Sequence, residues 1–334
     1  MIVRLGTRRS ALATAQSRWV AAWLETTGVA AGVRISVELV EMTSHGDVSS
    51  APLSSFGGVG VFVTRLRQAL LGGEVDIVVH SLKDLPTAPA AGLLLAAVPP
   101  REDPRDVLVA RAGSTLGELP TGARIGTGSP RRAAQLRALG LGLEVVDLRG
   151  NVDTRLRFVA EGRLDGVVVA RAGLVRLGRA DEATEVLDPL VMLPAPGQGA
   201  LAVECRDRAA DEPLASLLAR LDDRPTRAAV SAERSLLAAL EAGCTAPLGA
   251  LAEVAEGDEG EELSLRAVVA APDGSVCVRR STTGPVDAAD RLGKELAAGL
   301  LEEGIGELIR PVGASTVRNR AASPDPNHLR EGDT

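Results

Sequence analysis

A lysine and an aspartate stand side by side where a buried strand should end, in the stretch DIVVHSLKDLPT at residues 76–87. Its apolar run is typical of such a strand, and Pro86 stops any regular element that follows. The chain has lysine only at positions 83 and 294, and its other basic residues are arginine. A codon bias toward arginine explains that preference in general. Lys83 stands out against it, because arginine does not replace lysine where a compact ammonium group is needed.

A glycine-rich turn in GTGSPRR (126–132) predicts an anion site between a strand and a helix. The backbone N–H groups around Thr127 and Ser129 can face a ligand, and the following proline suits the first helical turn, where its missing N–H is not needed. Arg131 and Arg132 oppose the helix dipole at that end, which is favourable if an anion is bound. The pattern is neither a Walker loop nor a dinucleotide fingerprint. An ordinary loop with arginines in solvent remains the alternative.

Three further segments place arginines just after a predicted strand. Any one of these arginines, taken alone, fits a solvated surface position better than a ligand contact. Ligands of open α/β sheets bind at the carboxyl ends of the strands, and guanidinium groups pair bidentately with carboxylates. Together the segments therefore predict a cleft for a ligand with several carboxylates. The residues are Arg149 and Arg155 in VVDLRGNVDTRLRF, Arg171 and Arg176 in VVVARAGLVRLG, and Arg8, Ser10 and Gln16 in RLGTRRSALATAQ.

Three cysteines without CxxC spacing predict reduced thiols in a cytoplasmic protein. Cys244 lies in the loop LEAGCTAPLGA, after a helix that a glycine ends. A free cysteine is usually a small buried hydrophobic residue, whereas the glycine and proline neighbours favour an accessible thiol, and the loop alone leaves both open. Cys205 and Cys277 fall inside predicted strands, so we expect neighbours to pack around both. The histidines at 45, 80 and 328 lack metal-ligand spacing, so no metal is expected.

Strand and helix patterns alternate along most of the chain, which predicts an α/β protein with largely parallel sheets. The first helix is expected to carry Leu12, Ala15, Trp19 and Trp23 on one face. Strands are predicted at 2–5, 33–42, 75–80, 123–126, 144–148, 165–170 and 201–205, with short apolar runs at 93–98 and 107–110. Helices are predicted at 11–25, 61–72, 130–139, 152–161 and 214–240. Residues 250–310 predict two strands and a helix, with a hairpin turn at 271–274.

Two proline-containing breaks, at Pro99-Pro100 and at LPAPGQGA (193–200), bracket one α/β block. This arrangement predicts two similar domains joined by two crossings, with a cleft between them, and a third, small α+β domain. The expected boundaries are 1–98 plus 197–212 for the first domain, 99–196 for the second and 213–311 for the third. Residues 312–334 are polar and contain proline, so they are expected to form a disordered tail.

Composition narrows the classes of function. The net charge of −7 and the shortage of aromatic side chains argue against nucleic-acid binding. No apolar run approaches the ~20 residues of a membrane-spanning helix, so no membrane partner is expected. Gln16, Arg18 and Glu25 interrupt the apolar part of the N-terminus, which argues against a signal peptide.

Taken in order, the motifs resemble those of the porphobilinogen deaminase family, also called hydroxymethylbilane synthase. The similarity covers most of the chain, with every block in sequence. The shared blocks are RLGTRRSALATAQ, GDV, GGVGVF, VVHSLKDLPT, REDPRD, GTGSPRRAAQLRAL, LRGNVDTRL, ARAGLVRLG, LPAPGQGALAVECR and AERSLLAALEAGCTAPLGA.

The resemblance implies a transferase of tetrapyrrole and heme biosynthesis. Such an enzyme joins four porphobilinogen molecules head to tail, releases ammonia at each step, and hydrolyses off hydroxymethylbilane. It uses a dipyrromethane cofactor held through a thioether to a cysteine. The implied fold has a two-lobed pair of domains like the type II periplasmic binding proteins, plus a small third domain with the cysteine. The resemblance further implies a cytoplasmic monomer whose product passes to uroporphyrinogen-III synthase.

The resemblance also implies a role for each matching residue. Asp84 matches the catalytic carboxylate, which stabilises a cation formed from porphobilinogen and moves protons, and Cys244 matches the cysteine that carries the cofactor. The residues expected to bind the cofactor are Lys83, Asp84, Thr127, Ser129, Arg131, Arg132, Arg155 and Gln198. Those expected to bind substrate are Arg8, Ser10, Gln16, Phe62, Arg149, Arg155 and Arg176.

Some positions depart from the family pattern. Ser55, Val59 and Phe158 stand where many members have lysine, and Gly128 stands where others have serine. Whether Ser55 and Val59 weaken the mobile loop that they belong to is left open. The alternative function is a solute-binding protein for a polycarboxylate on the same two-lobed fold. It would explain the arginines, but it predicts an export signal and gives Cys244 no role.

Overall fold

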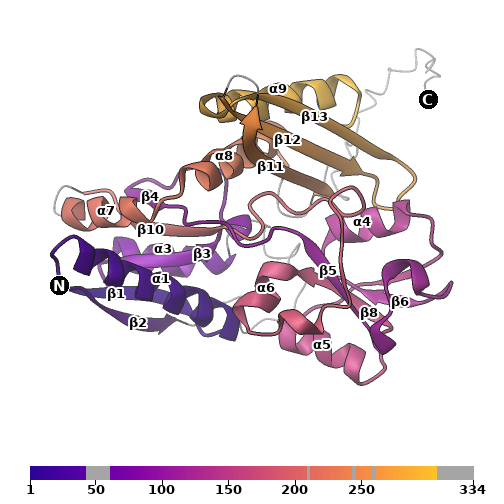
Figure 1. Ribbon diagram of the computed structural model, residues 1–334, viewed down its shortest axis with the longest axis horizontal. Coiled ribbons are helices and arrows are strands. Elements are labelled where there is room, and N and C mark those ends of the chain that lie inside the picture. The colour runs from indigo at the N-terminus through magenta and orange to yellow at the C-terminus, as the bar shows by residue number, and fades with distance from the viewer. Residues whose placement is uncertain (43–60, 209–210, 243–245, 258–259, 307–334) are drawn as a thin grey trace, which may run out of the picture.

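The computed structural model describes residues 1–42, 61–208, 211–242, 246–257 and 260–306, without the side chains of Val61 and Phe62. The described residues form two five-stranded sheets and one three-stranded sheet. In Figure 1 the three-stranded sheet and its helices lie above the two larger sheets, which stand side by side.

The first sheet has the strand order β2-β1-β3-β10-β4. Strand β1 is parallel to β2 and β3, whereas β10 is antiparallel to both β3 and β4. Helix α1 packs on β1, β2 and β3, and α3 packs on β3 and β1. The bounds are β1 (Ile2–Arg8), β2 (Ser36–Met42), β3 (Ile77–Ser81), β4 (Leu93–Ala97), β10 (Leu201–Arg206), α1 (Ala11–Ala30), α3 (Val61–Leu71) and α7 (Glu212–Leu218).

The second sheet has the order β7-β6-β8-β5-β9, with β6 parallel to β7 and β8, and β5 antiparallel to β8 and β9. The bounds are β5 (Asp106–Ala110), β6 (Arg124–Gly126), β7 (Glu144–Val146), β8 (Gly166–Ala170), β9 (Glu185–Val186), α4 (Pro130–Ala138), α5 (Val152–Ala160) and α6 (Arg171–Arg176).

The two larger sheets share one design. Each sheet contains four strands of its own unit and one strand that follows a crossing from the other unit. If the crossing strand is left out of the count, the order across each sheet is second, first and third strand, then the crossing strand, then the fourth strand. The crossing strands are β5, which enters the second unit, and β10, which returns to the first. Each is antiparallel to its neighbours, so the sheets are mixed and not simply parallel. This topology confirms the predicted α/β pair and the two crossings between its members.

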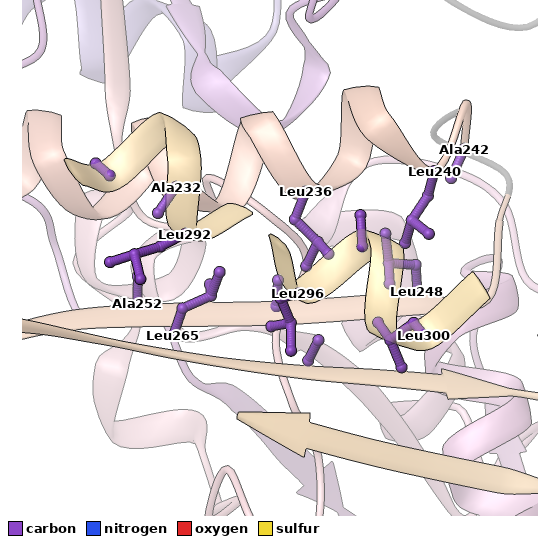
Figure 2. Packing of buried hydrophobic residues seen from close by; sticks show 14 of the residues in the cluster. Ala232, Leu236, Leu240, Ala242, Leu248, Ala252, Leu265, Leu292, Leu296 and Leu300 are labelled. Carbon is purple, nitrogen blue, oxygen red and sulfur yellow. The ribbon is translucent and has the colours of Figure 1, made fainter. Parts of the chain in front are cut away.

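The third unit is an antiparallel sheet, β11-β12-β13, covered by α8 and α9. Its core is almost entirely leucine and alanine, and Figure 2 shows these side chains between the helices and the sheet. Small alanines let α8 and α9 pack closely, while Leu236 and Leu300 are fully buried. The bounds are α8 (Arg224–Ala239), β11 (Leu248–Gly257), β12 (Gly260–Ala270), β13 (Cys277–Pro285) and α9 (Ala289–Glu302).

Several helices begin within a few residues of a strand end because a capping side chain stands there. Ser10 caps α1 by accepting from the N–H of Ala13, and Asn151 caps α5 by accepting from Thr154. Ser129 caps α4, with a proline at the first helical position, as the sequence predicts. These short turns put helix N-termini at the carboxyl ends of β1, β6 and β7, and they fix where the predicted ligand-binding residues emerge.

The structure contradicts one prediction about packing and shows which face of α1 is buried. Helix α1 buries Val20, Leu24 and Gly28, while Trp19 and Trp23 contact each other, with Trp19 46% exposed and Trp23 partly buried against the core of the first sheet. Cys277 is exposed and not packed, because it opens β13, an edge strand that pairs only with β12. Cys205 is fully buried, as predicted.

The C-terminal segment has three strands where two are predicted. The second half of β11 and the first half of β12 are rich in glutamate and face solvent. These halves lack the apolar alternation that indicates a strand, so the sequence did not show where one strand ends and the next begins. The predicted helix at 214–240 is divided between α7 and α8, because Pro225 can stand only in the first turn of a helix. The other predicted strands and helices are present with shifted ends.

One carboxylate of the third unit holds both crossings between the larger units. Glu233 on α8 is fully buried. Its two oxygens accept from the Nη1 and Nη2 atoms of Arg101 at 2.6 and 3.1 Å, and from the backbone N–H groups of Gly197 and Ala252 at 2.5 and 2.8 Å. Arg101 also donates from Nε to the carbonyl of Gln198 at 2.8 Å. Since Arg101 lies on one crossing and Gly197 on the other, Glu233 fixes the two segments together.

We predict that Glu233→Gln strongly destabilises the protein. The amide keeps the size of the side chain but removes the charge that pairs with Arg101, and breaking a buried ion pair on one side costs about 3–5 kcal/mol. Urea unfolding of the purified chain measures the loss. Glu295→Gln, which removes an exposed pair with Arg291 on α9, is the control and should leave the midpoint unchanged. Equal midpoints for the two variants would contradict the role given to Glu233.

Candidate active site

Lys83 and Asp84 lie in a short 3₁₀ turn that directly follows β3. Leu82 and Leu85 are buried and anchor this turn. Asp84 is exposed, whereas Lys83 is half-buried and its Nζ donates to Oε1 of Gln198 at 3.4 Å. The turn thus presents a carboxylate that a bound molecule can reach, beside an ammonium group that the protein holds in place.

Burial lowers the pKa of Lys83 to about 8, and Arg132 and Arg131 add to this shift, although Asp84 and Asp106 oppose it. An ammonium group with this pKa loses its proton more easily than an ordinary lysine does. Carboxylates bound nearby would reverse the effect, because they favour the charged form.

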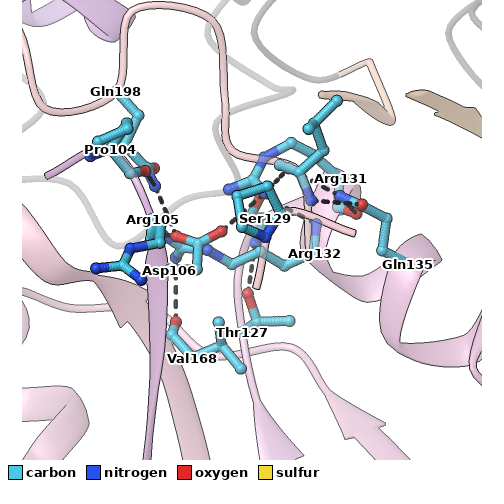
Figure 3. Close-up of polar contacts among 12 residues, drawn as sticks. Pro104, Arg105, Asp106, Thr127, Ser129, Arg131, Arg132, Gln135, Val168 and Gln198 are labelled. Carbon is cyan, nitrogen blue, oxygen red and sulfur yellow. Dashed lines mark hydrogen bonds and ion pairs between the residues drawn. The ribbon is translucent and has the colours of Figure 1, made fainter. Parts of the chain in front are cut away.

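Asp106, the first residue of β5, is the centre of the polar network in Figure 3. It is fully buried. Its Oδ2 accepts from Arg131 Nη1 at 2.8 Å, and its Oδ1 accepts from Arg132 Nη2 at 2.7 Å and from Gln198 Nε2 at 2.8 Å. Burial alone would raise the pKa of this carboxyl, but Arg131 and Arg132 outweigh burial and hold the pKa far below its usual value.

Both arginines are themselves buried, at 4% and 5% exposure, so they are not the solvated residues of the alternative reading. Arg131 Nη1 also donates to the carbonyl of Leu193 at 2.7 Å, and Arg132 Nη1 donates to that of Val168 at 3.1 Å. The Nε atom of Arg132 is buried and has no hydrogen-bond partner within the described residues. The carboxylates of Asp106 and Asp84 thus offset only part of the charge of Arg131, Arg132 and Lys83, and a donor of Arg132 is left over for an anion.

Arg155 and Arg149 extend this positive region. Burial lowers the pKa of Arg155 to about 10, with contributions from the like charges of Arg132 and Arg149. Arg155 Nε donates to the carbonyl of Gly150 at 2.9 Å, which holds its guanidinium against the turn before α5. Arg149 is exposed at the end of that turn.

Arg176 and Gln16 reach the site from two other elements. Arg176, on α6, donates from Nη2 to the carbonyl of Gly199 at 2.6 Å, and burial lowers its pKa to about 10. Gln16, on α1, is buried and hydrogen-bonds Ser81 through Nε2 at 3.1 Å. The two contacts lie next to Gln198 and to the Lys83 turn, respectively. Arg8 and Ser10 stand at the end of β1, where Ser10 caps α1.

The loop between β6 and α4 is shaped by Gly128. A Cβ atom on this residue would lie 2.5 Å from the carbonyl oxygen of Leu148, so the departure from serine lets this loop approach the neighbouring turn closely. Thr127 Oγ1 accepts from the N–H of Ser129 at 3.2 Å. Since Ser129 also caps α4, both hydroxyls brace the loop in this structure.

Several predicted residues lie outside the described part of the chain. They are Cys244, the side chain of Phe62, and the departures Ser55 and Val59. Phe158 is half-buried, and its ring stacks beneath the guanidinium of Arg163 at 4.0 Å. It also packs against the hydrophobic core of the second sheet, and it makes no contact with the network around Asp106 that the described structure records.

Sequence reasoning missed Asp106, although the other residues of its network were predicted. An aspartate that opens the wholly buried strand DVLVA is a detectable signal, because a lone charge in such a position needs partners. Arg101 and Glu233 were also missed. Their signal is weaker, since arginine and glutamate are common on solvated surfaces.

No cluster of three or more histidine, cysteine, aspartate or glutamate side chains is placed to hold a metal ion in the described part of the chain. None of its helices has the length and apolar character needed to cross a membrane.

The arrangement can bind a polyanion and move a proton beside it. Arg131, Arg132 and Lys83 supply charge-assisted donors for carboxylates. Asp84 supplies an exposed carboxylate that can stabilise a cation and accept a proton. The unpartnered Nε of Arg132 and the surplus of positive charge fit the carboxylate side chains of a dipyrromethane.

Comparison with known proteins gives a consistent result. Residues 3–214 match the family model described as the dipyrromethane cofactor binding domain of porphobilinogen deaminase, and residues 227–302 match its C-terminal domain. The porphobilinogen deaminases of Mycobacterium marinum and Mycobacterium tuberculosis are each 58% identical to this chain over 313 residues. These alignments cover 92% of this chain, and 97% and 98% of the two relatives.

Solved structures align with the chain at lower similarity. The methionine-binding protein MetQ has a TM-score of 0.42 at 14% identity, covering 66% of this chain and 89% of its own. The periplasmic VFT2 domain of BvgS from Bordetella pertussis has a TM-score of 0.39 at 16% identity, covering 66% of this chain and 86% of its own.

The sequence relatives decide between the two functions considered. The match extends over both family models, including the cofactor binding domain, and it favours the deaminase over a polycarboxylate solute-binding protein. The chain is thus a transferase of porphyrin and heme biosynthesis that acts on porphobilinogen with a covalently bound dipyrromethane cofactor. It belongs to the porphobilinogen deaminase family.

Proposed function

We propose that the positive network centred on Asp106, with the exposed Asp84 beside it, is the place where this chain condenses porphobilinogen into hydroxymethylbilane. The observation that carries the proposal is the surplus of buried positive charge. Lys83, Arg131 and Arg132 outnumber the neighbouring carboxylates of Asp106 and Asp84, and a buried donor of Arg132 has no partner in the described structure. Burying this much charge is unfavourable unless an anion completes the site.

Asp84 is proposed as the catalytic residue. Its carboxylate is exposed on a turn that Leu82 and Leu85 anchor, so its position is fixed while its oxygens stay accessible. Loss of ammonia from porphobilinogen leaves a cation, which a carboxylate stabilises. The same oxygens can then accept the proton released when the new carbon–carbon bond forms.

The cationic residues are proposed to divide between cofactor and substrate. Lys83, Arg131, Arg132, Thr127, Ser129 and Arg155 would hold the cofactor's acetate and propionate groups, and Gln198 would contribute by holding Lys83 beside them. Arg8, Ser10, Gln16, Phe62, Arg149, Arg155 and Arg176 would receive those of the substrate. The dipyrromethane, when bound, supplies the pyrrole to which the growing chain is joined. Arg155 belongs to both groups because it lies between Arg132 and Arg149.

Cys244 is proposed to attach the cofactor through a thioether. Cys205 is a poor candidate, because it is buried and burial raises the pKa of its thiol to about 11. Cys277 is exposed at the start of β13, on an edge strand of the third unit, and it lies outside the network around Asp106. Cys244 follows α8, the helix whose Glu233 holds both crossings.

The three sheets support the division into domains at 1–98 plus 197–212, 99–196 and 213–311. We propose that the chain works as a cytoplasmic monomer and that uroporphyrinogen-III synthase takes up its product.

Intact-protein mass spectrometry tests the proposed function directly. We expect the purified chain to exceed its sequence mass by two linked porphobilinogen residues. Cys244→Ser should remove the increment and the activity, because a serine hydroxyl is a far weaker nucleophile than a thiolate. Cys205→Ala and Cys277→Ser should keep both. An unmodified but fully active chain, from cells that make porphobilinogen, would contradict the covalent mechanism.

Asp84→Asn is expected to fold and to keep the mass increment, yet to lose roughly 10²–10⁴-fold in turnover. Asparagine preserves the shape of the side chain but neither carries charge nor accepts the proton. Consumption of porphobilinogen measures turnover, and Asp287→Asn, an exposed aspartate in the third unit, is the control. Near-normal consumption by Asp84→Asn would refute its assignment as the catalytic residue.

The lowered pKa of Lys83 predicts a pH dependence of anion binding. In cofactor-free protein Lys83 should titrate near pH 8, and bound carboxylates should raise that midpoint because they favour the charged form. Binding therefore takes up a proton above pH 8 and weakens as the pH rises further.

Carbon-13 dimethylation followed by NMR can measure this titration, since the chain has only two lysines. Lys83→Arg assigns the signal of Lys83, and Lys294 on α9 of the third unit provides an internal comparison. A Lys83 midpoint that is the same with and without cofactor would show that Lys83 does not contact the bound carboxylates.

A further inference from the structure

Asp106 and Gln198 connect the charged residues of both larger units. Asp106 opens β5, where the chain enters the second sheet, and Gln198 lies on the return crossing just before β10. Gln198 is 1% exposed. Its Nε2 donates to Asp106 Oδ1 at 2.8 Å and to the carbonyl of Pro104 at 2.7 Å, while its Oε1 accepts from Lys83. The two donor hydrogens of the amide are thus used within the protein.

This pattern forms a continuous connection from the Lys83 turn to helix α4. It runs from Lys83 through Gln198 to Asp106, and from Asp106 to Arg131 and Arg132 (Figure 3). Lys83 belongs to the first unit, and both arginines belong to the second. Asp106 therefore fixes the relative positions of cations that come from opposite sides of the site.

Asp106 also decides which guanidinium atoms remain for a ligand. It takes one Nη atom of each arginine, and the carbonyls of Leu193 and Val168 take Nη1 of Arg131 and Arg132 respectively. The Nε of Arg132 stays without a partner among the described residues. Because a planar guanidinium has its donors in a fixed fork, holding one edge determines where the other points.

We propose that Asp106 is a positioning residue for the bound cofactor: it orients Arg131 and Arg132 directly and Lys83 through Gln198. This inference rests on the proposed function of the site. Asp106 itself is fully enclosed and carries the charge opposite to the one that attracts carboxylates, so it acts through its partners and not by contact. Gln198 accordingly transmits the orientation to Lys83.

Asp106→Asn is the principal test, with Asp103→Asn as a matched control. Asp103 lies three residues earlier and also pairs with two arginines, Arg105 and Arg171, and neither is among the residues proposed to hold the cofactor or the substrate. Cofactor-free protein is prepared in cells unable to make porphobilinogen, and loading is then followed by intact mass after porphobilinogen is added. We expect Asp106→Asn to load about 10–100-fold more slowly, the range found when residues that orient ligand-binding side chains are removed, and Asp103→Asn to load normally.

The loading rate of the folded fraction separates positioning from a loss of stability. Asp106 raises the pKa of Lys83, so Asp106→Asn should move the carbon-13 midpoint below that of the unaltered chain, which shows that the folded variant has lost the Asp106 charge. Asp103→Asn should not move it. A purely structural role for Asp106 would lower the thermal midpoint but leave the loading rate of the folded fraction unchanged, and this result would overturn the proposal.

Gln198→Leu provides a second variant if Asp106→Asn does not fold. It breaks the connection to Lys83 without removing a buried charge. Slow loading with a normal thermal midpoint supports the proposal, and loading at the control rate overturns it. If the unaltered chain itself gains no mass from porphobilinogen, the proposed function fails. If it loads and both variants load equally well, only the positioning role fails.

Discussion

The chain crosses twice between its two five-stranded sheets. Two fully buried carboxylates, those of Glu233 and Asp106, hold these crossings in place. Glu233 gathers Arg101 and the N–H of Gly197 from the side of the third unit. Asp106 gathers Gln198 and two arginines from the side of the site. Buried carboxylates need several donors each, so neither residue tolerates a loose arrangement of the crossings. The position of one larger unit against the other depends on these two groups.

The same constraint explains why the site can carry a surplus of positive charge. Arg131 and Arg132 are kept from solvent by the segments that Asp106 and Leu193 hold in place. Such an arrangement costs free energy when no anion is present, since desolvated cations repel one another. A covalently attached ligand with several carboxylates offsets that cost permanently, because it does not dissociate. The charge of the site is therefore suited to a resident cofactor more than to a solute that comes and goes.

Local chemistry made the elements and the strand ends predictable. Serine, asparagine and proline at helix starts fix where each helix begins, so the turns at Ser129 and Asn151 could be placed from the sequence. The partners of a residue in the folded chain could not be predicted from local patterns, because Asp106 lies 25 residues from Arg131 and 92 residues from Gln198 along the sequence. The exposure of Cys277 and Trp19 likewise depends on which neighbours a strand or helix acquires, which no local pattern records. The site residues were found chiefly through the family resemblance, and the residue that joins them was not.

Both tryptophans of the chain stand on α1, with ring centroids 5.1 Å apart, and the sequence contains no tyrosine. Intrinsic ultraviolet emission above 300 nm therefore originates from a single helix, which packs on the first sheet. The half-exposed indole of Trp19 senses solvent, while Trp23 senses the core beneath it. Unfolding followed by tryptophan fluorescence therefore reports on the first unit alone, whereas calorimetry records the unfolding of all three units. The difference between the two midpoints measures how tightly the buried carboxylates couple the units into one cooperative whole.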